Sequence, residues 1–312
     1  MDSTPQISII IPTHNRRQLL EETLESVKSQ NINNWECIVI DDASSDDTWV
    51  YLQDLNDKRF KCFHFAESQE RSRARNHGLK HARGKYVLFL DDDDLLLEDT
   101  LQLHFNGLES NPHAFCSIGS SQLFWPDGKT EDWIATTKTG CKSITSELIF
   151  GWIPVSGQCL FRKENVNDIG GWNIDMNYAE DHEFMLRLAD NHSAFIMSDC
   201  VQLYRCHGQP RPDDLHETMT QLRKDYIATL PEEKRNAALK TLTARAIRED
   251  AEQAYEDARM FLSIRLYLKI LFLSPGLYFS PVTRKDLLPA LLKSFLGGPV
   301  IRAGRAIKSI IK

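Results

Sequence analysis

The chain has 312 residues, of which 42% are hydrophobic and 26% are charged, a composition typical of a soluble globular protein. The formal net charge is −7, but nine basic residues against one acid after residue 260 give that segment about +8 and leave about −15 for the remainder. The acidic remainder of the chain disfavours a long basic surface that binds a nucleic-acid backbone, so we expect no nucleic-acid partner.

The seven cysteines are scattered and form no CxxC pair, which predicts ordinary thiols in a reducing compartment and neither a disulfide framework nor a zinc site. No basic region with a cleavage site begins the chain, so we expect no secretory leader. The best apolar stretch near the C-terminus is interrupted by Arg265, Lys269 and Pro275, which disfavours a membrane-spanning helix. These features together predict a cytoplasmic protein.

The first 90 residues alternate between short apolar runs and helical patterns. Strands are predicted at Ile7–Ile11, Trp35–Ile40, Phe60–Phe65 and Tyr86–Leu90, and helices at Arg16–Gln30, Asp46–Leu55 and Ser72–Ala82. Continuous apolar strands separated by helices predict a doubly wound, mostly parallel α/β sheet with both faces covered. Ligands bind such sheets beyond the carboxyl ends of the strands, and polar or acidic loops follow the first, second and fourth of them.

The rest of the chain divides at about residue 212. From Leu95 the pattern is mixed, with helices expected near Leu101–Leu108 and Glu180–Ala189, and from residue 213 it becomes mostly helical. We therefore expect one domain over residues 1–212, with halves of about 1–95 and 96–212, and a basic and apolar helical region over residues 213–312.

Four consecutive carboxylates, Asp91–Asp94, follow the fourth predicted strand. Adjacent like charges raise each other's pKa unless positive charge neutralises them. A divalent cation such as Mn²⁺ or Mg²⁺, which also binds phosphate oxygens, would supply that charge. The alternative is a solvated acidic loop. A haloacid-dehalogenase nucleophile motif is excluded, because Leu95 and Leu96 stand where that motif requires Thr or Val, and because the motif follows a first strand.

Two-thirds of the chain, from about residue 6 to 207, resembles the inverting glycosyltransferase family 2, which has the GT-A fold. The resembling stretches are Ser8–Arg16, Ile38–Ser44, Ala74–Leu79, Ala82–Tyr86, Phe89–Asp94, Gly170–Trp172, Glu180–Asp181 and Arg187–Ala189. Each stretch is short, but their order and spacing together are specific. The resemblance implies a GT-A domain with a nucleotide-sugar half, an acceptor half and a C-terminal helical extension.

On the nucleotide side, the resemblance implies that Pro12, Thr13 and His14 border the base. His14 stands where the family often has an aromatic Tyr. Asp42 would accept a hydrogen bond from the base imide, which implies a uridine donor. The segment Glu67–Arg71 departs from the Asn and Gly that the family often has there, so contacts with the donor sugar are expected to differ.

Around the diphosphate, the resemblance implies that Arg75 lies near the phosphates or the acidic loop. Asp91 and Asp92 would face the ribose and the sugar. Asp93 would bind the Mn²⁺ or Mg²⁺ ion, and His207 would approach the same metal or the diphosphate.

Asp181 would be the catalytic base that takes the proton of the acceptor hydroxyl. Glu180 and Trp152 would contribute to the acceptor site. Apart from the resemblance, Glu180 and Asp181 also fit first-turn acids that complement a helix dipole, and Trp152 also fits a core residue.

The sequence thus predicts an inverting, metal-dependent hexosyltransferase that moves sugar from a UDP-sugar to a hydroxyl of a glycan or lipid-linked acceptor, as in polysaccharide biosynthesis for the cell envelope. A nucleotidyltransferase is one rival, although Pro12–Arg17 has no glycine-rich loop; a non-catalytic glycan-binding scaffold is another, although it would lack Asp93 or Asp181. The C-terminal region is expected to contact the inner face of the membrane, the catalytic domain or a second subunit.

Overall fold

The structure is a computed structural model that describes residues 4–133, 135–136, 138–176, 178–190, 192–207, 212–257, 259–280 and 283–296. It divides into two compact units. The first comprises Met1–Ile144 and Ile153–Met219, and the second comprises Thr145–Trp152 and Thr220–Lys312. The sequence placed one boundary near residue 212. Residues Thr145–Trp152 also join the second unit, and six of them form a helix too short to be assigned from its pattern.

The first unit contains every strand among the described residues. They are β1 (Ile7–Thr13), β2 (Trp35–Asp41), β3 (Phe60–His64), β4 (Tyr86–Phe89), β5 (Leu95–Leu96), β6 (Ala114–Phe124), β7 (Thr130–Trp133), β8 (Gly140–Lys142), β9 (Cys159–Arg162) and β10 (Ser193–Arg205). Its helices are α1 (Arg17–Lys28), α2 (Thr48–Gln53), α3 (Glu70–His81), α4 (Thr100–Ser110), α6 (Lys163–Asp168) and α7 (Glu180–Ala189), with a 3₁₀ turn at Ser156–Gln158.

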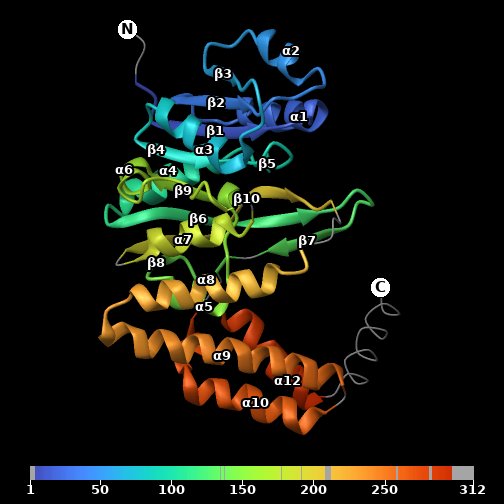
Figure 1. The fold of residues 1–312 in the computed structure, drawn as a ribbon, viewed down its shortest axis with the longest axis vertical. Coiled ribbons are helices and arrows are strands. Elements are labelled where there is room, and N and C mark those ends of the chain that lie inside the picture. Colours follow the sequence, from blue (N-terminus) through green and yellow to red (C-terminus); the bar gives the residue numbers. More distant parts are fainter. Residues whose placement is uncertain are drawn as a thin grey trace. The chain divides into compact units, whose positions relative to one another are not determined.

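The strands form one ten-stranded sheet in the order β3-β2-β1-β4-β9-β6-β10-β5, with β7 beside β6 and β8 beside β10 (Figure 1). β3, β2, β1 and β4 run parallel, which confirms the predicted parallel arrangement of the first four strands. β6 and β10 are also parallel. β9 lies between these two parallel groups and runs antiparallel to both of its neighbours.

Helices cover both faces of the parallel strands, as a doubly wound sheet requires. On one face, Ile9 and Ile11 of β1 pack with Leu20 and Leu24 of α1 in the main core. On the other face, Gly78 of α3 approaches so closely that a Cβ there would lie 2.5 Å from the Ile10 side chain. Alternate residues of a strand point to opposite faces, so β1 is mostly apolar on both faces, and its buried Ser8 donates a hydrogen bond to Glu36. The sheet thereby brings the ends of β1, β2 and β4 to one edge.

The second unit is helical, which confirms the predicted C-terminal helical extension. It contains α5 (Thr145–Phe150), α9 (Glu232–Glu256), α10 (Met260–Leu273), α11 (Pro275–Phe279) and α12 (Arg284–Leu296), and α8 (Leu215–Thr229) crosses from the first unit into it. Its core joins Phe150 of α5 to Ala244 and Ala251 of α9 and to Tyr267 and Ile270 of α10. The small alanines let α9 and α10 approach closely.

Within the described residues, no helix is long and apolar enough to cross a membrane. All seven cysteines are free thiols. The basic residues Arg302, Arg305, Lys308 and Lys312, and the segment 208–211 beside the expected boundary, lie outside the described residues.

Candidate active site

Four residues near the ends of strands or the starts of helices lie in the left-handed backbone region. Asn15, Ala43, Glu70 and Ala179 have φ of 53°, 61°, 67° and 62°, and they are the only non-glycine residues with positive φ in the part of the chain that the structure describes. Such backbone costs about 1–2 kcal/mol for a residue with a Cβ. Each lies beside, or contacts, a residue implicated from the sequence, and strain of this kind clusters at functional sites.

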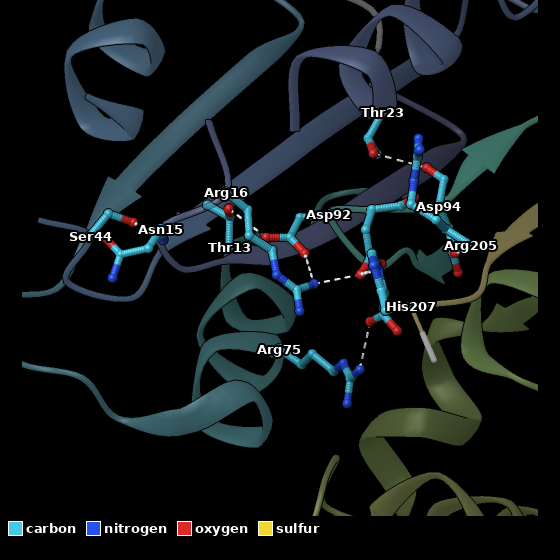
Figure 2. A network of polar contacts seen from close by, with 12 residues as sticks. Thr13, Asn15, Arg16, Thr23, Ser44, Arg75, Asp92, Asp94, Arg205 and His207 are labelled. Carbon is cyan, nitrogen blue, oxygen red and sulfur yellow. Dashed lines mark hydrogen bonds and ion pairs between the residues drawn. The ribbon is translucent and has the colours of Figure 1, made fainter. Parts of the chain in front are cut away.

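The acidic turn after β4 is held from the β1 side by Arg16 and Thr13 (Figure 2). Arg16 Nη1 donates to Asp92 Oδ1 at 2.9 Å and to Asp93 Oδ2 at 2.5 Å, and the Thr13 hydroxyl donates to Asp92 Oδ2 at 2.7 Å. Burial nevertheless raises the pKa of Asp92 to about 6, since Arg16 lowers it less than burial and the neighbouring Asp93 and Asp91 raise it. Asp92 therefore ionises less readily than an exposed aspartate, whereas Arg75 lowers the pKa of the neighbouring Asp91.

From the β10 side, the same turn is held by Arg205 and His207. His207 Nε2 lies 2.8 Å from Asp93 Oδ2, and Arg205 Nε donates to the Asp93 carbonyl at 2.9 Å. The Asp94 carboxylate accepts the Arg205 backbone N–H at 2.8 Å and the Gln202 amide at 2.5 Å. Burial raises the pKa of Asp94 well above its usual range. Asp94 thus ties β10 to the acidic turn.

The oxygens of the tetrad suit a hard divalent cation. Carboxylate oxygens of Asp91, Asp93 and Asp94 lie within 4.8 Å of one another. Oxygen ligands are those that Mg²⁺ and Mn²⁺ prefer, with positions left for phosphate and water. These three carboxylates therefore fit the predicted metal ion. One of them, Asp93, also contacts His207.

Arg75 connects the acidic turn to the start of α7. Its fully buried guanidinium donates to Asp91 Oδ1 at 2.8 Å and to Glu180 Oε1 at 3.2 Å, and Nη1 lies 4.0 Å from Asp181 Oδ1. It also lies over the Trp172 ring, 4.3 Å from the centroid. Burial alone would lower the pKa of Arg75, but the three carboxylates raise it, so the side chain is a permanent cation.

Asp181 occupies the first turn of α7 in an unusual state for a carboxylate. Its side chain is 32% exposed, yet Oδ1 is enclosed and accepts no hydrogen bond within the described part of the chain. Desolvation of that oxygen raises the pKa of Asp181 to about 7; Arg75 lowers it, and Glu180 and Asp91 raise it. A carboxylate that titrates near neutrality and lacks a donor is suited to accept a proton.

The predicted base-binding residues lie at the ends of β1 and β2. Pro12 and Thr13 belong to β1, and His14 Nδ1 donates to the Asp42 carbonyl at 2.6 Å. The Asp42 carboxylate accepts the Ser68 hydroxyl at 2.7 Å and the backbone N–H groups of Gln69 at 2.7 Å and Glu70 at 3.1 Å. Asp42 thus orients the segment Glu67–Arg71 at the start of α3, the segment that differs from the family pattern. The contact between Asp42 and a nucleotide base stays a prediction.

The structure brings together residues that the sequence did not assign. Arg16 forms ion pairs with Asp92 and Asp93, and Arg205 holds the turn through the Asp93 carbonyl while its guanidinium pairs with Glu22. Both arginines lie in or next to stretches already singled out, which was the available indication. Of the predicted acceptor residues, Glu180 is buried against Arg75, with Arg71 Nη1 at 3.5 Å. Trp152 belongs to the second unit and is 9% exposed.

Comparisons with known proteins find relatives that match part of this chain. A glucosyltransferase of Campylobacter jejuni named for the acceptor GalNAc(5)-diNAcBac-PP-undecaprenol is 44% identical over 115 residues, 36% of this chain and 37% of its own length. The Escherichia coli enzyme WfgD, named as a UDP-Glc:α-D-GlcNAc-diphosphoundecaprenol β-1,3-glucosyltransferase, is 33% identical over 109 residues, 35% of this chain and 43% of its own. The matched stretches span about half or less of such relatives, from 18% to 51%.

A solved structure of S. aureus TarS residues 1–349 in complex with UDP-GlcNAc superposes with a TM-score of 0.65 at 20% identity, covering 86% of this chain and 82% of that one. This likeness confirms the GT-A fold. The profile of glycosyl transferase family 2 matches residues 8–207, nearly two-thirds of the chain. The protein therefore belongs to glycosyl transferase family 2.

Proposed function

We propose that the protein is an inverting, metal-dependent glycosyltransferase that moves a hexose from a UDP-sugar to a hydroxyl of a glycan carried by a lipid-linked acceptor. The uridine donor is supported by the fold shared with a UDP-GlcNAc complex, and the acceptor class by relatives named for diphosphoundecaprenol acceptors. The observation that carries the chemistry is the enclosed, unbonded Oδ1 of Asp181, close to the acidic turn.

The reaction would be a single displacement with Asp181 as the base. An acceptor hydroxyl beside Asp181 Oδ1 loses its proton to that oxygen as the hydroxyl oxygen attacks the anomeric carbon. The new C–O bond forms while the bond from the anomeric carbon to the diphosphate oxygen breaks, and the electron pair leaves with UDP. Attack opposite the leaving group inverts the anomeric centre. A pKa near 7 keeps Asp181 basic enough to take the proton and partly ionised at neutral pH.

The donor would lie over the ends of β1, β2 and β4. Pro12, Thr13 and His14 would border the uracil, with Asp42 near its imide. Asp91 and Asp92 would face the ribose and the sugar. Arg75 fixes the distance between this donor side and Asp181, because one guanidinium contacts Asp91, Glu180 and Asp181. Holding both reactants in one geometry is a large part of catalysis by positioning.

Asp93, together with the neighbouring carboxylates Asp91 and Asp94 or with His207, would hold Mn²⁺ or Mg²⁺. When bound, such an ion supplies positive charge that stabilises the negative charge growing on the leaving diphosphate. Arg16 Nη1 contacts the Asp93 oxygen that His207 also contacts, so Arg16 would have to move or share that oxygen when a cation binds. Glu180 and Trp152 remain our candidates for acceptor contacts.

A screen of UDP-sugars tests the proposal by measuring UDP release with Mn²⁺ or Mg²⁺, alongside donor affinity by thermal shift. Ligand that binds only the folded state raises its melting temperature, so metal-dependent stabilisation by UDP is expected. Asp93→Ala should weaken donor binding. Asp181→Asn should spare donor binding and abolish UDP release, since an amide cannot take the proton.

Two outcomes would count against it. If no UDP-sugar is turned over and UDP with metal causes no thermal shift, the enzymatic function is wrong. If Asp93→Ala binds UDP as tightly as the unmodified protein, the metal assignment is wrong while transfer by Asp181 still stands.

A lipid-linked acceptor would place the enzyme in the cytoplasm against the inner face of the cell membrane. The helical second unit offers the surface for such contact.

A further inference from the structure

The outward face of α10 is apolar and basic. Its exposed residues recur at helical spacing: Phe261, Leu262, Arg265, Leu268, Lys269 and Phe272. At about 100° per residue these six side chains fall within an arc of about 120°. Phe261 and Phe272 are 91% and 85% exposed, an unusual state for phenylalanine in a soluble protein. We call these six residues the α10 outer face.

The opposite side of α10 already forms the core of the second unit. Ser263, Tyr267 and Ile270 are buried, and Tyr267 and Ile270 pack with residues of α9, α11 and α12. Tyr267 also accepts, through its carbonyl, the hydroxyl of Tyr278 at 2.8 Å. α10 is therefore anchored without the outer face. The apolar residues of that face do not contribute to the stability of the unit, so another cause must account for them.

Charge decides which partner fits this face. Arg265 and Lys269 alternate with the apolar side chains, α10 contains no acidic residue, and neither cation makes an ion pair with any described residue. A second copy docked face to face about a two-fold axis would bring the same cations against each other. An anionic bilayer instead offers headgroup phosphates to Arg265 and Lys269 and an apolar layer to the phenylalanines.

The size of α10 indicates how it would bind. Fourteen residues of helix are about 21 Å long, whereas a helix that spans a bilayer needs about 20 apolar residues. α10 would therefore lie in the plane of the interface. The same unit exposes further apolar side chains, Phe279 of α11 and Leu288 and Leu292 of α12, at 76%, 42% and 51%. Figure 1 shows α10 and α12 within this unit.

We propose that the α10 outer face is a membrane-docking surface that binds anionic lipid bilayers at their interface, with Phe261 and Phe272 inserted and Arg265 and Lys269 on the headgroups. The proposal rests on the proposed function for its setting, since a lipid-linked acceptor resides in a membrane. Docking would confine the enzyme to the surface that holds its acceptor.

Flotation of the full chain with vesicles tests it, using phosphatidylcholine alone and phosphatidylcholine with phosphatidylglycerol. Binding to the anionic vesicles only, weakened by salt, is expected. Phe261→Ser with Phe272→Ser should reduce the partition coefficient by tenfold or more, on the order expected from two buried aromatic side chains. Arg265→Gln with Lys269→Gln should remove the preference for anionic lipid. Leu239→Ser, on α9 of the same unit and 45% exposed, is the matched control and should bind as the unmodified chain does.

Several results would overturn the inference: no binding of the unmodified chain to anionic vesicles, equal binding by the double phenylalanine variant, or a dimer in sedimentation velocity that this variant abolishes. UDP release from a UDP-sugar is measured on the same samples without vesicles. A chain that releases UDP but does not bind vesicles refutes only the docking surface, whereas a chain that releases no UDP counts against the proposed function. The double phenylalanine variant should retain that activity, because its substitutions lie far in sequence from the residues of the acidic turn and α7.

Discussion

Arg75 is the residue whose replacement should reveal the most about the candidate site. Arg75→Met keeps an apolar stem but removes the buried charge from Asp91, Glu180 and Asp181, and with it the guanidinium that lies over the Trp172 ring. Removing one partner of a buried ion pair leaves the others uncompensated and costs about 3–5 kcal/mol of stability. The same change should also act on the base, because Arg75 lowers the pKa of Asp181 more than the other nearby cation, Arg71, does.

The size of that second effect follows from the geometry. Arg75 Nη1 and Asp181 Oδ1 are 4.0 Å apart, and at an effective dielectric constant of 20 two unit charges at this distance interact by about 4 kcal/mol. Asp181 is about a third exposed, so solvent screening reduces this value to roughly half. One pKa unit corresponds to about 1.4 kcal/mol. We therefore expect the pKa of Asp181 to rise by about 1 to 2 in Arg75→Met.

The assay is the pH dependence of UDP release, in which Asp181 must be ionised to take a proton. For the unmodified enzyme, activity should rise with pH and be half-maximal near pH 7. The rising limb should move to higher pH in Arg75→Met and much less in Arg75→Lys, which keeps the charge. Arg73→Met is the control, since Arg73 lies on the same helix but is exposed and makes no ion pair with a described residue.

A profile for Arg75→Met that superposes on that of the unmodified enzyme, or that moves to lower pH, would refute the reasoning. If Arg75→Met does not fold, Arg75→Lys still provides a test. It should lose stability because an ammonium cannot reproduce the fork of contacts, while its rising limb stays near that of the unmodified enzyme.

Two further predictions concern stability. In Gly84→Ala the new Cβ would lie 2.6 Å from the backbone nitrogen of Ser8 in β1, which cannot move aside, so urea unfolding should show a loss of about 1–3 kcal/mol; Gly276→Ala, with no atom within 4 Å of its Cβ, should show none. Asp92 has a folded pKa of about 6 against about 3.9 unfolded, so its ionisation costs stability as pH rises through that window. In EDTA, Asp92→Asn should therefore lose roughly 2 kcal/mol less than the unmodified protein between pH 4 and 6.5, and equal losses would contradict the assigned pKa.

Local patterns were sufficient for much of the N-terminal fold. The predicted strand at Ile7–Ile11 is β1 extended to Thr13, and the predicted helix at Arg16–Gln30 is α1. A strand covered on both faces is mostly apolar, and a helix covered on one side shows a single apolar stripe. Since the ends of parallel strands meet at one edge, the sequence also indicated that the acidic turn would face the loops after β1 and β2.

Contacts between distant parts of the chain were decided only by tertiary structure. The antiparallel β9 between β4 and β6 and the assignment of Thr145–Trp152 to the second unit both depend on partners far away in sequence. The same holds for Asp94, which appeared to be one of four equivalent acids but is a buried acceptor for Arg205, 111 residues later.

What the sequence by itself determined was therefore the set of apolar segments and the acids at their ends, because burial on a sheet acts on each segment separately. What only the tertiary structure decided was which charges meet. Arg75 is bonded to Glu180, 105 positions away, and this contact places the enclosed oxygen of Asp181 near the acidic turn. A periodicity of two or of 3.6 residues carries no information about pairing over that separation.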